Sequence, residues 1–191
     1  MTSQVQPHNG SRHCVIAAIG GNQPSNKGNP AETVLWAMGV LSERIGSPIR
    51  KSRLFQTPAF PVGSGPDFVN AAVAFESGLS PEDILGLCHA IEADAKRVRD
   101  VRWGVRTLDV DLIGCGGAVC PDVAGFAAWR DLPIEQQTEM APDQLILPHP
   151  RLQDRAFVLV PMMDVAPDWS HPVSGLTTRQ MLDTLPAMEK A

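Results

Sequence analysis

The chain has 191 residues, a formal net charge of −5 and a sequence pI of about 5.5. This acidic balance argues against a general nucleic-acid binder, which needs a basic face. No apolar stretch approaches the roughly 18 residues that span a bilayer, and the polar start of the chain lacks the apolar centre of a signal peptide, so we expect a cytoplasmic location. The length suits a single domain at 14–191 that follows a flexible N-terminal segment at 1–13.

The first predicted elements are a strand and a helix. Residues 14–20 form a short apolar run that ends at two glycines, which is typical of a buried strand. Asn29, Pro30 and Glu32 form a helix start, and Gly46 is a typical helix end. The apolar face of this helix contains Val34, Leu35, Met38, Leu41 and Ile45.

The following segments complete a mixed fold. Residues 49–56 and 68–76 predict two more strands, Ser80 begins a second helix, and a last strand covers the apolar run around 108–113. The inward residues of the second helix are Ile84, Leu85, Cys88, Ile91 and Ala95. The resulting order is that of an α+β fold with a ferredoxin-like βαββαβ core, in which helices pack on one face of an antiparallel sheet.

The rest of the chain forms a C-terminal extension of this core. Residues 116–122 predict an additional edge strand, and 122–144 show no sustained period, which predicts a long loop or insert. Thr177 begins a short amphipathic helix. The four cysteines are too few and too scattered for a disulfide scaffold, so we expect free thiols in or near the core.

The most informative pair of residues is Asp109 and Asp111, inside an apolar run. Side chains alternate along a strand, so both carboxylates point the same way, roughly 6 to 7 Å apart, while Leu108, Val110 and Leu112 point into a core. Neighbouring carboxylates repel each other, and a hard cation such as Mg²⁺ relieves this. The alternative interpretation is a pair of solvated groups at a strand end.

An arginine cluster precedes this strand. Arg97, Arg99, Arg102 and Arg106 lie within fifteen residues of Asp111. Guanidinium groups suit phosphate oxygens, so carboxylates and arginines together indicate phosphoryl or pyrophosphoryl transfer from a metal-bound nucleotide. Positive charge at the end of a helix is the simpler alternative for the first two arginines.

At this point the chain resembles a known family, the 6-hydroxymethyl-7,8-dihydropterin pyrophosphokinases (2-amino-4-hydroxy-6-hydroxymethyldihydropteridine diphosphokinases). The resemblance covers residues 14–170 and rests on five segments: AIGGN at 18–22, FQTPAF at 55–60, DFVNAAVAFE at 67–76, RWGVRTLDVDLI at 102–113 and LPHPRLQDRAFVLVPM at 147–162. It implies a Mg²⁺-dependent transferase of folate biosynthesis. Such an enzyme moves the β,γ-pyrophosphoryl group of ATP to the hydroxymethyl group of the pterin and releases AMP.

The resemblance also implies two sets of binding residues. The pterin set is Gly20, Thr57, Pro58, Phe60, Phe68, Asn70, Trp103 and Phe157. The ATP set is Glu92, Arg97, Arg99, Trp103, Arg106, Ile113, His149 and Arg155. Asp109 and Asp111 are expected to hold two Mg²⁺ ions, and with Arg97 and Arg106 they form the expected catalytic group. The partners are then ATP and a reduced pterin, with no nucleic acid or membrane, and we expect a monomer.

Some positions depart from the family pattern, and other functions stay open. Pro150 stands where some relatives have a tyrosine that touches ATP, and Gln144 stands where some have an arginine. From the residues alone, an ordinary exposed helix carboxylate is the favoured interpretation of Glu92. A nucleotide or pterin sensor and a transferase acting on another alcohol are the alternative functions. The nucleotide product, AMP or ADP, separates a pyrophosphokinase from a simple kinase.

Overall fold

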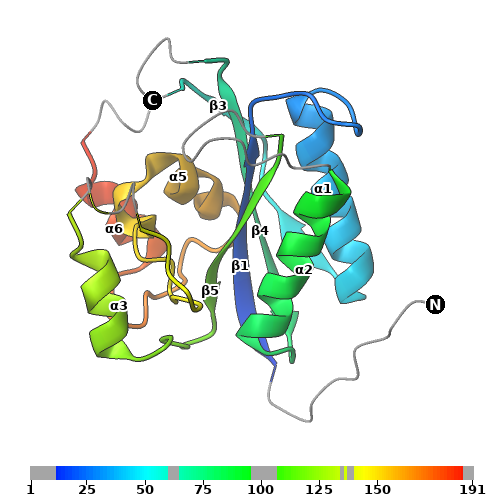
Figure 1. The fold of residues 1–191 in the computed structure, drawn as a ribbon. Helices are drawn as coiled ribbons and strands as arrows, with labels where there is room; N and C mark the ends of the chain where they lie inside the picture. Colours follow the sequence, from blue (N-terminus) through cyan, green and yellow to red (C-terminus); the bar gives the residue numbers. More distant parts are fainter. Residues whose placement is uncertain (1–11, 60–64, 96–106, 134–135, 137–139, 187–191) are drawn as a thin grey trace.

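The computed structural model describes residues 12–59, 65–95, 107–133, 136 and 140–186. Its centre is an antiparallel sheet of β1 (His13–Gly21), β2 (Ile49–Lys51), β3 (Phe55–Thr57), β4 (Phe68–Ser77) and β5 (Asp109–Cys115). The strand order is β2, β4, β1, β5, with β3 also paired to β4 (Figure 1). This arrangement confirms the ferredoxin-like core and the α+β class.

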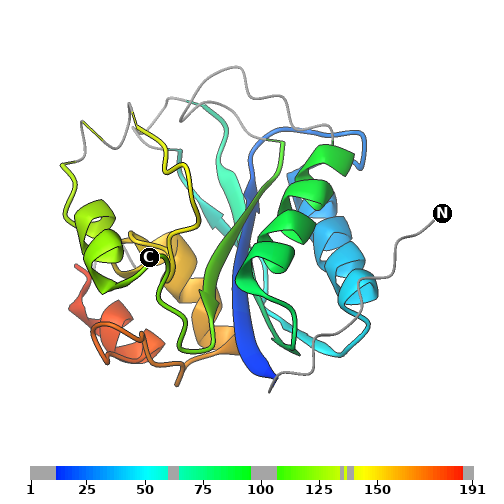
Figure 2. The ribbon, with the colours of Figure 1, turned by 60° about the horizontal axis from the view of Figure 1, so that its bottom comes forward.

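Two helices between the strands cover one face of the sheet, as Figures 1 and 2 show from two directions. Helix α1 (Pro30–Ile45) begins with a capping box of Asn29 and Glu32, and Gly46 ends it with a φ of 65°. Helix α2 (Pro81–Asp94) begins at Ser80, whose side chain accepts a hydrogen bond from the Asp83 N–H. Both starts agree with the sequence because short polar caps satisfy the first N–H groups of a helix.

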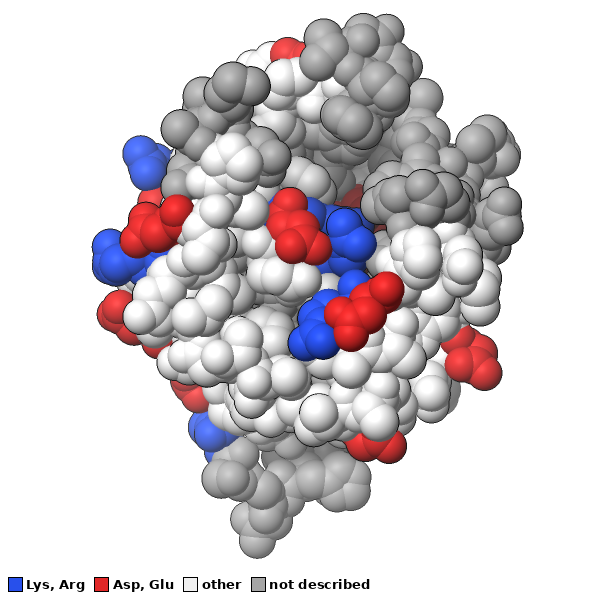
Figure 3. All heavy atoms as spheres, turned by 90° about the vertical axis from the view of Figure 1, so that its left-hand side faces the viewer, with Lys and Arg blue, Asp and Glu red and all other residues white. Residues whose placement is uncertain are grey.

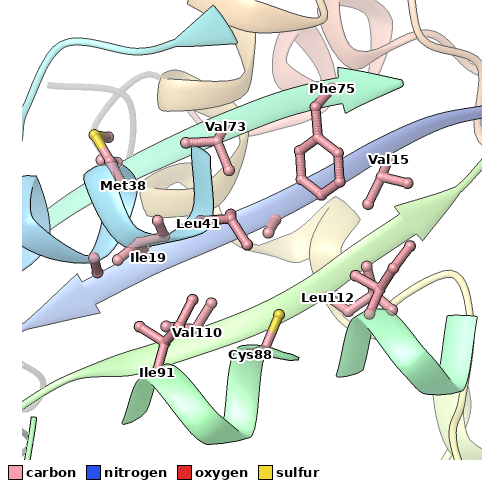
Figure 4. Packing of buried hydrophobic residues seen from close by; sticks show 14 of the residues in the cluster. Val15, Ile19, Met38, Leu41, Val73, Phe75, Cys88, Ile91, Val110 and Leu112 are labelled. Carbon is pink, nitrogen blue, oxygen red and sulfur yellow. The ribbon is translucent and has the colours of Figure 1, made fainter. Parts of the chain in front are cut away.

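The main hydrophobic core lies between this face and the two helices. Side chains from α1, α2 and the three long strands meet there (Figure 4), and Leu41, Val73 and Phe75 are at most 1 % exposed. Leu108, Val110 and Leu112 also belong to this core, which confirms the side to which they were predicted to point. Burial of this continuous apolar surface stabilises the fold.

The opposite face of the sheet is covered as well, which differs from the predicted single helical layer. The C-terminal part of the chain contributes α5 (Ala156–Val165) and α6 (Thr178–Thr184), which pack with a second apolar cluster on this face. Ile16, Ala72 and Ala74 are fully buried there. The central strands β1 and β4 are therefore apolar on both faces, and a second layer is needed to keep water from them.

Three local predictions are corrected. Residues 49–56 form two short strands rather than one. The segment 116–122 makes only an isolated bridge between Cys120 and Leu147, because Pro121 has no N–H with which to continue a ladder. The predicted loop at 122–144 begins with helix α3 (Val123–Arg130), which Asp122 caps.

Other features of the described chain agree with the sequence. Thr177 begins α6 with a capping box, and a short 3₁₀ turn, η1 (Leu152–Asp154), precedes α5. The four cysteines are free thiols. Among the described residues, no helix combines the length and apolar character needed to cross a membrane.

Candidate active site

Two polar residues and a glycine form a row across one end of the sheet. Gly20 of β1 is paired with Asn70 of β4 on one side and with Asp109 of β5 on the other. Directly paired residues in antiparallel strands project to the same face, so these three share the face that α5 covers. Two residues back along β1, Ala18 is paired in the same way with Asp111. The sheet thereby places an amide and two carboxylates side by side.

The amide of Asn70 lies across the glycine. Its Nδ2 donates to the Thr57 hydroxyl at 2.7 Å, and a Cβ atom added at Gly20 would lie 2.6 Å from its Oδ1. Asn70 is 7 % exposed, which is low for an amide. Any larger residue at position 20 would displace this amide, so Gly20 is required by close approach rather than by backbone conformation.

The two aspartates are partly buried and project from the strand away from the main core. No cluster of three or more Asp, Glu, His or Cys side chains able to hold a metal occurs in the described part of the chain. Two carboxylates alone still fit Mg²⁺, because this ion commonly binds through one or two carboxylates and completes its shell with substrate phosphates and water. The donor set thus suits a cation that arrives with a nucleotide.

His149 lies beside this pair and is held by backbone contacts. Its backbone N–H donates to the carbonyl of Ile113 at 2.8 Å, and its ring Nδ1 accepts the backbone N–H of Arg151 at 3.2 Å. Burial lowers the pKa of His149 to about 3, Arg155 and Arg151 add to this, and Asp109 opposes it. The ring is therefore neutral at ordinary pH and, since Nδ1 is an acceptor, has its proton on Nε2.

Arg155 and Phe157 lie at the start of α5. The guanidinium of Arg155 lies 5.6 Å from the ring centroid of Phe157, and this ring is 42 % exposed. An exposed aromatic ring next to a cation offers a stacking surface for a flat ligand. Phe68 is partly buried on the face of Asn70, whereas Ile113 is 1 % exposed in the second apolar cluster.

Glu92 is placed inside the protein, so the exposed-carboxylate alternative is wrong. It is 4 % exposed, and its Oε1 accepts the N–H of Val110 at 2.8 Å. Glu92 lies four residues after Cys88 and one after Ile91, both predicted to point inward, so helical spacing already placed it at the inward face, but nothing in the sequence indicated the bond to Val110. Five predicted site residues lie outside the described residues: Phe60, Arg97, Arg99, Trp103 and Arg106.

Basic and acidic side chains lie at the middle of one side of the molecule as well as along its edges (Figure 3). Figure 3 views the protein from the side of α3 and α6, and basic side chains flanked by acidic ones lie in a hollow at the middle of this face. Uncharged atoms border the hollow in this view, and further charged side chains lie toward the edges of the face. Such a recess fits a ligand that has both anionic and flat apolar parts.

The fold defines the class as an α+β protein with a ferredoxin-like sheet, and the row of polar groups at one end of this sheet is its candidate site. The family model of the 7,8-dihydro-6-hydroxymethylpterin-pyrophosphokinases (HPPK) matches residues 16–167. The chain belongs to this family, which confirms the resemblance in the sequence. The matched region runs from β1 to the end of α5 and so includes the whole row.

Relatives agree with this family assignment, and a solved structure agrees with the fold. A 2-amino-4-hydroxy-6-hydroxymethyldihydropteridine pyrophosphokinase of Synechocystis sp. is 37 % identical over 175 residues, which are 90 % of this chain and 75 % of the relative. The enzyme of the same name from Methylorubrum extorquens is 33 % identical over 84 % of this chain and 89 % of its own length. The wild-type HPPK-DHPS of Plasmodium falciparum has a similar fold, with a TM-score of 0.62 at 13 % identity, over 92 % of this chain and 45 % of that one.

Proposed function

We propose that the pyrophosphoryl transfer of this family takes place at the row formed by Asn70, Gly20 and Asp109. The chain is a transferase of folate biosynthesis that moves the pyrophosphoryl group of ATP to hydroxymethyldihydropterin. The observation that supports this location is the strand pairing, which brings an amide suited to a pterin within two strands of carboxylates suited to a metal-bound nucleotide.

The pterin is proposed to bind on the Asn70 side of the row. Asn70 offers an amide oxygen and an N–H to the donor and acceptor edge of the ring, and the absence of a side chain at Gly20 lets this amide lie there, since an added Cβ atom would be 2.6 Å from its Oδ1. Thr57 holds the amide through its hydroxyl, and backbone groups at Pro58 and Phe60 complete the edge. Phe68, Phe157 and Trp103 supply the aromatic faces.

The nucleotide is proposed to bind on the Asp109 side. Asp109 and Asp111 would hold two Mg²⁺ ions, which would neutralise phosphate charge and orient the reacting groups. His149 presents a neutral Nε2–H, and Arg155 adds a positive charge next to it. The remaining proposed contacts are Glu92, Arg97, Arg99, Trp103, Arg106 and Ile113.

The proposed reaction is an in-line displacement. The hydroxymethyl oxygen attacks the β-phosphorus of ATP, a new O–P bond forms, and the bond from the β-phosphorus to the α,β-bridging oxygen breaks. AMP leaves with that oxygen, and the alcohol loses its proton. Positioning by Asn70 and charge stabilisation by the arginines supply the rate enhancement, because a good leaving group and an oriented alcohol need no covalent help from the protein.

Chromatography of the nucleotide products tests this function. Purified protein is incubated with ATP, Mg²⁺ and 6-hydroxymethyl-7,8-dihydropterin, with a matched sample that lacks the pterin. The proposal expects AMP only when the pterin is present and no AMP after removal of Mg²⁺ with a chelator. Formation of ADP would indicate a simple kinase, and saturable ATP binding without turnover would indicate a sensor.

The site needs only one copy of the chain in this proposal. Strands and segments of a single chain supply the whole described row, so we expect a monomer that acts in the cytoplasm, where ATP is available, without nucleic acid or membrane. Light scattering during size-exclusion chromatography would show a mass near 20.6 kDa for a monomer.

A further inference from the structure

The strand that carries both aspartates has one free edge. Within the described sheet, β5 is the last strand and pairs only with β1. Backbone groups of successive residues in an antiparallel strand point alternately toward the partner and away from it. The N–H of Val110 goes to the Glu92 side chain, so it points away from β1, while those of Asp109 and Asp111 point toward β1.

The Glu92 carboxylate accepts a hydrogen bond at this edge, where a further strand would otherwise pair with β5. Glu92 reaches from α2 and accepts the Val110 N–H at 2.8 Å, and both residues are at most 4 % exposed. A backbone N–H left without a partner at such a buried place is costly, so the presence of an acceptor oxygen within reach is what stabilises this edge. Val110 stands between the two aspartates in the chain, so this bond fixes the strand where both carboxylates leave it.

A second contact holds the same free edge further along. The pairing with β1 shifts by one residue at Ile113, so its carbonyl faces this edge and accepts the backbone N–H of His149 at 2.8 Å. The two contacts lie on either side of Asp111, one from α2 and one from the segment that carries His149. In addition, burial and, to a smaller extent, the charges of Glu92 and Asp111 raise the pKa of the Cys88 thiol.

We infer that Glu92 is a positioning residue for the proposed metal-binding strand: its carboxylate oxygen holds the Val110 N–H and thereby sets the direction of Asp109 and Asp111. This inference rests on the proposed function of the two aspartates. This role is separate from the nucleotide contact proposed for Glu92 above, because it depends on the reach of the carboxylate oxygen to the Val110 N–H rather than on the negative charge.

Two substitutions of Glu92 distinguish the effect of side-chain length from that of the negative charge. Glu92→Gln keeps the length of the side chain and an acceptor oxygen but removes the charge. Glu92→Asp keeps the charge and withdraws the oxygen by one methylene. Glu82→Gln, on an exposed position of the same helix, is the matched control for loss of a carboxylate. All three variants keep a polar side chain of similar size, which favours folding.

The first measurement does not depend on activity. Hydrogen exchange of the Val110 amide is followed by NMR, together with Mn²⁺ binding by electron paramagnetic resonance in the presence of α,β-methylene ATP. In Glu92→Asp we expect the Val110 amide to exchange at least about 10-fold faster than in the wild type and Mn²⁺ to bind more weakly, while the amides of β4 keep their protection. Glu92→Gln and Glu82→Gln should stay within about threefold of the wild type in both measurements.

Steady-state kinetics give the second measurement. Glu92→Asp should lower kcat by about 10- to 100-fold, the cost of a small misplacement of reacting groups, and Glu92→Gln should restore most of this loss. If Glu92→Asp and Glu92→Gln lower kcat equally while the Val110 amide stays protected from exchange, the inference is wrong, and the charge of Glu92 acts on the ligand instead. A fast Val110 amide with unchanged kcat and Mn²⁺ affinity would overturn it in favour of a purely structural bond. If the wild type makes no AMP, the proposed function fails, and the exchange and Mn²⁺ data still test the Val110 contact.

Discussion

The two faces of the sheet are formed by the same strands but differ in composition. The face under α1 and α2 is apolar from Val15 to Ile19 along β1, with matching residues on β4 and β5. The face under α5 and α6 is apolar only at one end, and at the other end it carries the row with Asn70 and Asp109. Because side chains alternate, a strand can support a stable core with one set of residues and a reaction site with the other.

Removal of a carboxylate from the second face should have the largest effect on activity. We expect Asp109→Ala or Asp111→Ala to abolish Mg²⁺-dependent turnover, because each removes half of the proposed metal-binding pair. Pterin-dependent AMP formation measures the loss, and circular dichroism checks that the fold is kept. Asp168→Ala, which removes an exposed carboxylate outside the row, is the control. Near-normal activity in both site variants would contradict the two-metal assignment.

Damage to the first face should affect stability and leave the chemistry intact. Phe75 is 1 % exposed in the main core, so Phe75→Ala should lower the free energy of unfolding by about 3–5 kcal/mol. Urea unfolding measures this change. The molecules that stay folded should keep the wild-type kcat. A fall in kcat larger than the fall in the folded fraction would show that the two faces are coupled.

The sequence predicted the first face better than the second. Asn29 and Glu32 predicted the start of α1, and alternation predicted that Asp109 and Asp111 leave the core together. Alternation gives the face of each residue but not the register between strands, so it did not show that Gly20, Asn70 and Asp109 form one row. The register depends on packing along the whole length of the strands.

The elements of the second face were harder to predict for local reasons. Helix α5 contains Pro161 within an almost wholly apolar segment, so neither a helical period nor the usual absence of proline indicated it. The start of α3 had a cap at Asp122, but the following small and apolar residues show no clear period. The Glu92 contact joins a helix side chain to a strand backbone, which no residue pattern encodes.

A methyl group at Gly20 tests how closely the row is packed. The added Cβ of Gly20→Ala would lie 2.6 Å from Asn70 Oδ1, so the amide must move. We expect the KM for the pterin to rise about 10- to 100-fold, in line with the cost of misplacing one binding group, while the affinity for ATP changes little. Gly39→Ala is the control, because nothing lies within 4 Å of its added Cβ. An unchanged KM would exclude Asn70 as the pterin contact.

The neutral state of His149 predicts how stability varies with pH. Its pKa is about 3 in the folded protein, lowered mainly by burial, and near 6.5 in the unfolded chain. Between these values only the unfolded state binds the proton, so this contribution to stability is complete above about pH 6.5 and is lost as the pH falls toward 3. His149→Gln removes this ionisation and should weaken the pH dependence of urea unfolding between about pH 7 and 5. The same slope in both proteins would contradict a buried neutral ring.

The smallest effect on stability is expected for the exposed ion pair that joins the segment between β2 and β3 to α5. Arg53 donates from Nε and from its backbone N–H to Asp164 near the end of α5, and its Nη2 lies 2.9 Å from the same carboxylate. The Arg53 side chain is 77 % exposed, so solvent screens the pair, and Arg53→Ala should lower the free energy of unfolding only slightly. Thermal unfolding compares it with Asp164→Ala, whose loss should be similar. A much larger loss, or a change in kcat, would mean that this ion pair sets the position of α5 over the site.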